Sequence, residues 1–410
     1  MPEKLKIAIV TTARSDFGVL KRVIHHAAMR FEVDLLVAGS HFLISRGNTV
    51  REIEQEFGNR QDINIVSFNA MEEACTPSAQ VRTIANTQLL SSRWFESHRY
   101  ALLLFLGDRW ELWGVTLSAF MHGIPLAHIS GGEVTEGVID DCIRHAHTKI
   151  AGLHFVATEA YARNISLMGE EDWRISVVGE CGIDQIHDSE MATIDEVKSR
   201  FSVNLEQDTI LVTFHPSTLD LQTPVQNQID AVLLALASFP DYQIVFTAPG
   251  VEQGSETVLA SIRLFVDRHS NALFVDHFGS RNYLAVMSRA KAVVGNSSSG
   301  LVEASSLGVP AINIGSRQKN RLAADSVQHV PYVVSDIKLA IARALGSDYQ
   351  AYARNCPNPY DPFCDGKNSL RIVQALERAL AVCLPEQLRV KKFDNQVHSD
   401  IWNTLLQEKS

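Results

Sequence analysis

The chain has 410 residues, of which 46% are hydrophobic and 20% charged, and a formal net charge of −10. This length exceeds what one hydrophobic core usually serves, so we expect two domains. The negative charge disfavours nucleic acid and anionic membranes as partners, and no apolar run is long enough to span a bilayer. The six cysteines show no metal-finger spacing and the charged N-terminus leads directly into an expected strand, so we expect a cytoplasmic protein without a signal peptide.

Apolar segments that suit buried strands alternate with amphipathic segments along the chain. In the first half the expected strands are residues 5–11, 33–38, 63–67, 101–106, 125–129, 153–157 and 174–179. The series restarts with residues 208–214, 242–247, 272–275, 291–295 and 310–314. Near-continuous apolar strands separated by helices are typical of parallel sheets covered on both faces. The sequence therefore predicts an α/β fold with two Rossmann-like doubly wound units.

The joint between the two units is expected near residues 182–205. We place the N-terminal domain at residues 1–185 and the second domain at residues 186–365, followed by a helix and a charged tail at 366–410. The segment 355–366 is rich in Pro, Asn and Asp and is predicted to be a loop. The ligand site of such a pair of domains is expected in the cleft between them.

Acids follow two neighbouring strands of the first unit. Asp108 and Arg109 come directly after the expected strand 101–106, and Glu133 follows the strand 125–129. Further along the same segment lie Glu136, Asp140 and Asp141. Because ligands of parallel α/β sheets bind at the carboxyl ends of the strands, this segment predicts a functional site.

Two loops could cradle an anion. Residues 11–18 follow the first strand and open a helix that Ser15 or Asp16 can cap, and Arg14 could contact a phosphate. An ordinary strand–helix loop is an equal alternative, and the absence of a G-x-G-x-x-G motif disfavours nicotinamide. The second loop, Gly295–Gly300, offers Ser297 and neighbouring hydroxyls, unless it is only a serine-rich helix cap.

Other polar residues at the second sheet edge support an anion site. Glu303 is placed to accept ribose hydroxyls, and Arg317 follows the next strand. His215 ends a strand and could bind phosphate or shuttle a proton, although a loop histidine is the simpler interpretation. A metal at His145, His147 and Cys142 is disfavoured, because their spacing is not that of helical ligand pairs.

With these motifs in view, the chain resembles the hydrolysing UDP-N-acetylglucosamine 2-epimerases, the branch that supplies N-acetylmannosamine for sialic and related nonulosonic acids. The resemblance runs nearly end to end and in the family's order. The matching segments are Thr12–Gly18, Gly39–Glu54, Gly107–Glu111, His128–Lys149, Val178–Asp184, His215–Pro216, Asp276–Leu284, Gly295–Arg321 and Asp365–Asn368.

The resemblance implies a glycosyltransferase-B-like fold whose last helix returns to the first domain. It implies that the second domain holds most of the UDP and the first domain holds the sugar, with no metal or redox cofactor and with a homodimer or homotetramer as the assembly. The residues implied to bind UDP are Arg14, Arg109, His215, Ser297, Ser298, Glu303 and Arg317.

The implied reaction eliminates UDP to a 2-acetamidoglucal and then adds water to give N-acetylmannosamine. Asp108 matches a catalytic aspartate, and Asp140 or Asp141 matches a second acid. The sequence departs from the family at Ser130, where many relatives carry glutamate. Glu133 is the nearest replacement unless it only caps a helix or forms a salt bridge, and Glu136 is a weaker one.

Several alternatives remain at the level of the sequence. The substrate could instead be UDP-N,N'-diacetylbacillosamine, on the route to legionaminic acid, with residues 39–48 and 77–95 expected near the part of the sugar that differs. A glycosyltransferase or a non-hydrolysing epimerase would bind the same nucleotide. A non-catalytic UDP-sugar-binding protein is favoured by Ser130 but disfavoured by the intact Asp108, Asp140 and Asp141.

Overall fold

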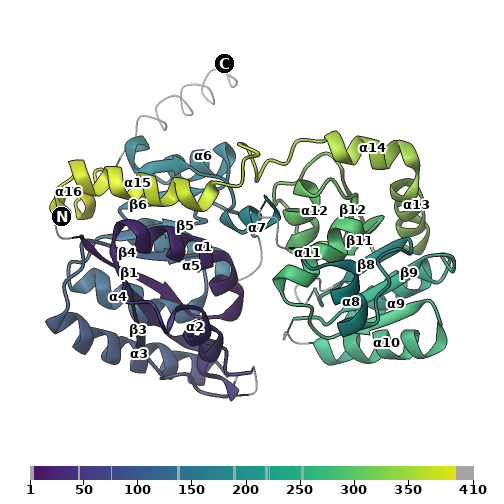
Figure 1. The fold of residues 1–410 in the computed structure, drawn as a ribbon, viewed down its shortest axis with the longest axis horizontal. Coiled ribbons are helices and arrows are strands. Elements are labelled where there is room, and N and C mark those ends of the chain that lie inside the picture. The colour runs from purple at the N-terminus through teal and green to yellow at the C-terminus, as the bar shows by residue number, and fades with distance from the viewer. Residues whose placement is uncertain are drawn as a thin grey trace. The chain divides into compact units, whose positions relative to one another are not determined.

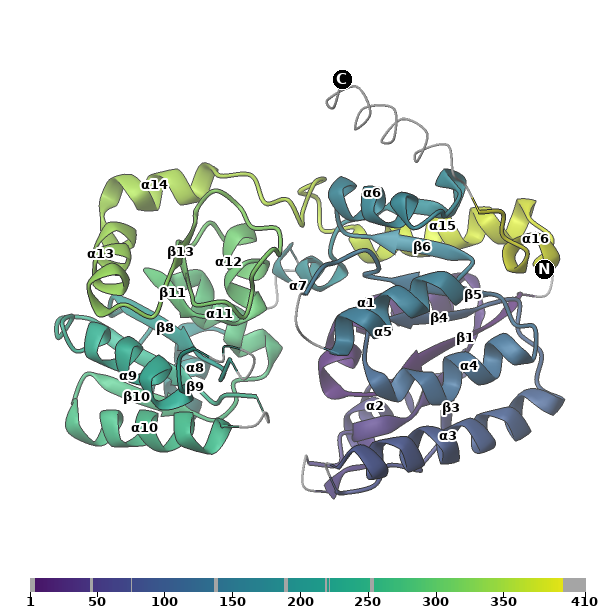
Figure 2. The same ribbon diagram turned by 180° about the vertical axis from the view of Figure 1, so that it is seen from behind.

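The computed structural model describes residues 4–44, 47–74, 76–135, 139–187, 191–217, 220, 222–250 and 254–393. The chain divides into two compact units (Figure 1, Figure 2). The first is built within Met1–Val134, Val138–Asp184 and Lys367–Ser410, and the second chiefly within Gln185–Gly366. Glu136 and residues 394–410 of the tail lie outside the described residues.

A seven-stranded parallel sheet forms the centre of the first unit, in the order β3-β2-β1-β4-β5-β6-β7. The strands are β1 (Lys6–Thr11), β2 (Glu32–Val37), β3 (Ile63–Ser67), β4 (Leu103–Leu106), β5 (Leu126–Ile129), β6 (Leu153–Val156) and β7 (Ile175–Val177). The strand order reverses between β1 and β4, which pair directly. The loops that follow these two strands therefore flank the point where ligands bind in folds of this kind.

Helices cover both faces of this sheet (Figure 1). They are α1 (Arg14–Arg30), α2 (Val50–Phe57), α3 (Pro77–Ser97), α4 (Trp113–Met121), α5 (Ile139–Ile150), α6 (Glu159–Leu167), α15 (Asn368–Val382) and α16 (Pro385–Arg389). Alternate residues of β1 enter two different cores, because side chains alternate along a strand. Ile7 and Ile9 pack with α1, α2 and α15, whereas Ala8 and Val10 pack with α3 and α4.

The start of α1 differs from the expectation. Its N-cap residue is Ala13, and neither Ser15 nor Asp16 holds that position. Asp16 lies inside the first turn and accepts hydrogen bonds from the backbone N–H groups of Thr12 (2.8 Å) and Ala13 (2.9 Å). Asp16 thus binds, from within the helix, the N–H groups of the N-cap residue and of the residue before it.

The second unit has a six-stranded parallel sheet in the order β10-β9-β8-β11-β12-β13. The strands are β8 (Thr209–Thr213), β9 (Gln243–Thr247), β10 (Ala272–Val275), β11 (Ala292–Gly295), β12 (Ala311–Ile314) and β13 (Val327–Val330). The helices are α7 (Asp184–His187), α8 (Ile194–Phe201), α9 (Val225–Leu236), α10 (Ser255–Arg268), α11 (Ser280–Arg289), α12 (Glu303–Ser306), α13 (Val334–Leu345) and α14 (Ser347–Asn355). Its strand order reverses between β8 and β11.

The predicted fold class, two doubly wound α/β units, is confirmed. One strand was missed, the edge strand β13. Its sequence VQHV contains no apolar run, because an edge strand is only partly buried. None of the helices within the described residues has the length and hydropathy needed to cross a membrane.

Candidate active site

The loops after β4 and β5 leave the first sheet side by side, because parallel pairing aligns the last residues of the two strands. Gly107, the first residue after β4, has a φ of 80°, a left-handed conformation that favours glycine. The buried His128 donates from Nε2 to the Gly107 carbonyl oxygen over 2.8 Å. Burial holds the pKa of His128 well below its usual value. A neutral imidazole therefore fixes the start of the loop that carries Asp108.

Arg144 joins three of the predicted positions. Its side chain, 5% exposed, forms an ion pair with Asp108 through Nη2. Its Nη1 lies 3.3 Å from Asp141 Oδ1 and donates to the backbone carbonyl oxygen of Glu133 over 2.9 Å. Arg144 follows Asp141 by three residues on α5, so the helix itself brings these two side chains to one face. The structure therefore places the carboxylates of Asp108 and Asp141 and the backbone of Glu133 around one guanidinium.

Asp140 is part of the same acid group. Burial raises the pKa of Asp140 to about 6, and the nearby charge of Asp108 adds to the rise, while Arg109 and Arg144 oppose it. A carboxyl group with such a pKa can take up and release a proton close to neutral pH. Burial, helped by the nearby Asp108, thus lets Asp140 exchange a proton near neutral pH.

Arg109 stands beside these acids as a cation. Burial lowers the pKa of Arg109, but the charges of Glu111, Asp16 and Asp140 outweigh this effect and raise it. Its Nη2 lies 2.5 Å from Glu111 Oε1. A permanently charged guanidinium at a sheet edge can stabilise an anion there.

Ser130, the position that departs from the family, has a φ of 61°. Its Oγ lies 3.5 Å from Oε2 of Glu180, which follows β7 at the same edge of the sheet. Glu180 also accepts a hydrogen bond from the Gly182 N–H over 3.3 Å, so it has a capping role as well. Glu133, the predicted replacement, is 6% exposed. Glu136 lies outside the described residues.

The three residues weighed as metal ligands have separate surroundings. His145 Nε2 lies 3.3 Å from Asp141 Oδ2. His147 is fully buried, with Nε2 3.0 Å from Thr116 Oγ1, and its ring stacks on Trp113. Cys142 is exposed. Across the part of the chain that the structure describes, no three His, Cys, Asp or Glu side chains group as a metal site.

Arg14 points to a different partner from the one expected. Its half-exposed side chain forms an ion pair with Glu52 of α2 over 3.1 Å. The backbone N–H groups of Thr12 and Ala13, which were expected to face a phosphate, donate to Asp16 instead. This loop is therefore satisfied internally, and a role for Arg14 with UDP stays a prediction.

The serine loop of the second unit begins at Gly295, where β11 ends. A Cβ at this position would lie 1.9 Å from the Thr213 carbonyl oxygen, so the close approach to β8 requires glycine. Ser297 caps the short turn Ser298–Gly300, because its Oγ accepts from the Ser299 N–H over 3.4 Å. Ser299 Oγ lies 2.8 Å from the Tyr283 hydroxyl. The capping interpretation therefore accounts for the Ser297 hydroxyl, and the half-buried Ser298 begins the turn.

Asn296 holds His215 in place. The His215 N–H donates to Asn296 Oδ1 over 2.7 Å, and Asn296 Nδ2 donates to the His215 carbonyl oxygen over 2.8 Å. His215 Nδ1 accepts from the Gly250 N–H over 2.8 Å, so the proton of the neutral ring is on Nε2. Burial and the charge of Arg317 lower the pKa of His215 to about 4. The ring is therefore a neutral hydrogen-bond donor at physiological pH rather than a cation.

Arg317 contacts the same asparagine, since its Nη1 donates to the Asn296 carbonyl oxygen over 3.2 Å. The structure thus groups His215 and Arg317 around Asn296. Glu303 begins α12, and burial raises its pKa. The cation that opposes this rise is Arg321, not Arg317.

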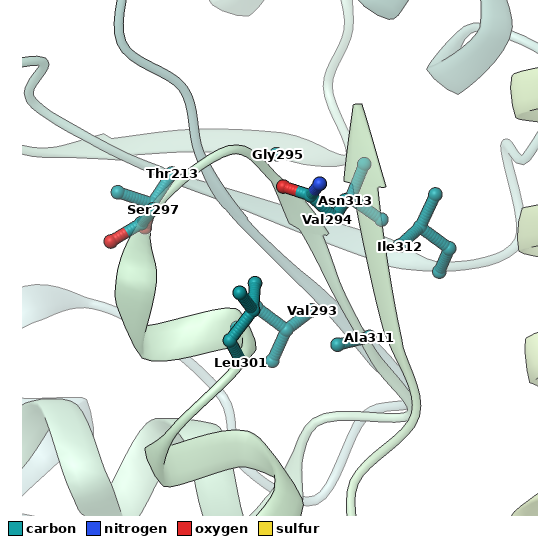
Figure 3. A pocket seen from close by; sticks show the side chains of 10 residues that line it. Thr213, Val293, Val294, Gly295, Ser297, Leu301, Ala311, Ile312 and Asn313 are labelled. Atoms are coloured by element: carbon teal, nitrogen blue, oxygen red, sulfur yellow. The ribbon is translucent and has the colours of Figure 1, made fainter. Parts of the chain in front are cut away.

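Two cavities lie near these residues. The one behind the serine loop has a volume of about 10 Å³. Figure 3 shows Val293, Leu301 and Ala311 in its wall, with Ser297 at the loop. It could hold one water at most. A larger cavity of about 690 Å³ lies at the carboxyl ends of β12 and β13 and includes Arg321 in its wall. This second volume is in the range of small-molecule sites.

A sequence profile of the UDP-N-acetylglucosamine 2-epimerases matches residues 24–377 of the chain. The chain belongs to the UDP-N-acetylglucosamine 2-epimerase family. The polysialic acid biosynthesis protein P7 of Escherichia coli is 30% identical over 381 residues, which cover 90% of this chain and 93% of that protein. The GDP/UDP-N,N'-diacetylbacillosamine 2-epimerase (hydrolyzing) of Campylobacter jejuni is 30% identical over 350 residues, 85% of this chain and 89% of that protein.

A solved structure of the family shows the shared fold. The UDP-GlcNAc 2-epimerase from Neisseria meningitidis, bound to UDP-GlcNAc, matches with a TM-score of 0.70 at 18% identity, over 91% of this chain and 100% of that chain. The glycosyltransferase-B-like fold implied by the resemblance is thereby confirmed for this member of the epimerase family.

Sequence reasoning missed three residues that organise the candidate residues of each unit: Arg144 and Glu111 in the first unit, and Asn296 in the second. Each has a signal in the sequence. Arg144 follows Asp141 at the helical spacing i, i+3, and Glu111 ends the strand-end motif that begins at Gly107. Asn296 follows β11 directly. Their roles depend on partners from distant segments, which spacing alone does not give.

Proposed function

We propose that this protein is a hydrolysing 2-epimerase that converts UDP-N-acetylglucosamine and water into N-acetylmannosamine and UDP. The observation that carries the proposal is the group of acids around Arg144, formed by Asp108, Asp140 and Asp141 at the edge of the first sheet. The relative from Campylobacter jejuni, whose name states a hydrolysing reaction, supports the hydrolysing mode.

The chemistry requires such a group. The C2 proton of the sugar is not next to a carbonyl, so it cannot be removed and returned by simple enolisation. In the proposed first step a carboxylate takes the C2 proton while the bond from C1 to the diphosphate oxygen breaks, which leaves a C1–C2 double bond and UDP. In the second step the hydroxyl of water adds to C1 and a proton adds to C2 from the opposite face. The net reaction of the two steps is epimerisation at C2 with hydrolysis of the bond to UDP.

We assign Asp140 as the base, because its raised pKa makes it a better proton acceptor that is still ionised above pH 6. Asp108 or Asp141 then supplies the returning proton. Arg109, Arg317 and the Nε2–H of His215 stabilise the departing diphosphate. Ser298 and Glu303 are proposed to contact the nucleotide.

A second substrate is favoured by the names of relatives. Two relatives that are 30% identical, from Campylobacter jejuni and Legionella pneumophila, are named as hydrolysing epimerases of N,N'-diacetylbacillosamine nucleotides. The second candidate is therefore the same reaction on UDP-N,N'-diacetylbacillosamine. The proposed pathways, to sialic-type or legionaminic acids, follow from the sugar that is used.

A proton NMR time course in deuterated buffer tests both substrates in separate tubes. We expect UDP and a manno-configured sugar with deuterium at C2 in one of them. Intact nucleotide attached to an epimerised sugar would show the non-hydrolysing mode, and no change in either tube would contradict an epimerase.

The variant D108N separates catalysis from binding. We expect turnover to fall by about 10³-fold or more, because the group of acids around Arg144 loses one of its carboxylates, while calorimetry shows nearly unchanged UDP affinity. An equal loss of affinity would mean that Asp108 acts in nucleotide binding or in the structure. Normal turnover would remove Asp108 from the mechanism.

A further inference from the structure

Glu111 is a buried acid that the proposed reaction does not use. It lies in the short turn Trp110–Leu112, two residues after Arg109, and is 2% exposed. Its Oε1 is 2.5 Å from Arg109 Nη2. Within the described residues, Oε2 of Glu111 and Nε of Arg109 make no hydrogen bond. The carboxylate and the guanidinium are thus joined by the contact between Oε1 and Nη2, and not through Oε2 or Nε.

The base of the Glu111 side chain is closely packed. A Cβ on Gly39 would lie 3.1 Å from the Glu111 Cβ and 2.6 Å from the Thr12 carbonyl oxygen. Glu111 is therefore packed against Gly39 of the loop that follows β2, and Gly39 in turn packs against Thr12 of the loop that follows β1. A buried carboxylate is costly without a cation beside it, so Arg109 is strongly favoured to remain there.

We propose that Glu111 is a positioning residue that holds the Arg109 guanidinium at the sheet edge, oriented toward the departing diphosphate. This inference rests on the proposed function and deepens it. The Arg109 side chain is 36% exposed, so a ligand can reach it while Glu111 anchors one of its N–H groups. A guanidinium oriented before the reaction needs no rearrangement when negative charge develops on the leaving group. A lysine could not replace it, because the ammonium lacks the planar fork.

The test compares E111Q with a matched control, E170Q. Glu170 is also a buried, ion-paired glutamate (1% exposed), with Lys391 at 2.8 Å, but it precedes β7 and so lies at the opposite, amino-terminal edge of the sheet. Thermal unfolding should show a loss of stability in both variants. We expect kcat/KM to fall by about 10- to 100-fold in E111Q, mainly through kcat, and by less than about 2-fold in E170Q. Equal kinetic losses would overturn the inference.

A double-mutant cycle with R109Q tests whether Glu111 acts through Arg109. If it does, E111Q changes kcat/KM by less than about 2-fold in the R109Q background. Multiplicative losses would overturn the inference while leaving the proposed function intact. Wild-type protein that turns over neither UDP-sugar would instead overturn the proposed function, and the inference with it. Should E111Q fail to fold, R109K supplies the test, because a wild-type kcat without the guanidinium fork would also overturn the inference.

Discussion

At the scale of single residues, burial and neighbouring charges shift the pKa values of the candidate residues in each unit. Asp140 has an ordinary side chain, yet burial and the nearby Asp108 raise its pKa to about 6. His215 is shifted the other way, because burial and Arg317 lower its pKa to about 4. One group thus becomes a proton acceptor suited to neutral pH, and the other becomes a fixed neutral donor.

The pH dependence of kcat/KM tests the role of Asp140. A base must be deprotonated to act, so kcat/KM should rise with pH through about 6 and then level off. We expect D140N to lower kcat by about 10²-fold or more and to abolish this limb. A wild-type profile that instead falls through the same pH range would assign Asp140 as the acid.

The same variant should change stability in a predictable direction. The folded-state pKa of Asp140 is raised, so ionising this group opposes folding above about pH 6 and has no such cost below its ordinary pKa of 3.8. We therefore expect D140N to unfold at a higher temperature than the wild type at pH 7.5. This gain should disappear as the pH falls from 6 towards 4.

At the scale of elements, the pattern of apolar residues predicts most of the strands. The fully buried strands of both sheets were predicted because their apolar runs are nearly continuous, whereas the half-exposed β13 was missed. The loops at the carboxyl ends were predicted to carry the site. The contacts between the side chains that follow these strands were not predicted. Arg144 and Asp108, for example, are 36 residues apart in sequence and meet only in the folded unit.

The turn at Gly39 offers a test of how closely these loops pack. Gly39 has a φ of 62°, and an added Cβ would meet Thr12 and Glu111. We expect G39A to lower the free energy of unfolding by about 2 kcal/mol or more, through left-handed strain and overpacking. We also expect it to reduce kcat/KM, since Glu111 must shift.

G47A is the matched control for this prediction. Gly47 has a φ of 85°, but no atom of the described residues beyond its chain neighbours lies within 4 Å of its Cβ position, so it carries the strain without the clash seen at Gly39. We expect G47A to lower the free energy of unfolding by only about 1 kcal/mol. Equal effects of the two variants would show that packing against Thr12 and Glu111 is unimportant.

At the scale of the whole molecule, the chain returns to its first unit after completing the second. The Asp184 carboxylate accepts from the backbone N–H groups of Asn368 (2.9 Å) and Ser369 (2.7 Å), so the last residue of the first pass caps the returning helix α15. Ile372 and Leu376 of α15 then enter the core of the first unit. The stability of the unit that carries the acids therefore depends on residues from the end of the described chain.

Arg174 fixes the segment that follows α15. Its side chain, 2% exposed, donates from Nη1 to the carbonyl oxygen of Gly152 over 3.1 Å, and from Nη2 to those of Gln387 (2.9 Å) and Val390 (3.0 Å). We expect R174M to lower the free energy of unfolding by about 3 kcal/mol, because it leaves buried carbonyl groups without a donor. Urea unfolding monitored by circular dichroism measures this loss.

An exposed arginine that contacts the returning helix α15 provides the control. Arg30 of α1 is 51% exposed and lies 3.6 Å from Glu377 of α15, so R30M should cost less than about 0.5 kcal/mol. Both variants should keep the wild-type kcat per folded molecule, since neither residue lies in the acid group.

If R174M were no less stable than R30M, packing of α15 alone, rather than Arg174, would hold the returning segment. If R174M lost kcat while folded, that segment would contribute to the order of the site itself.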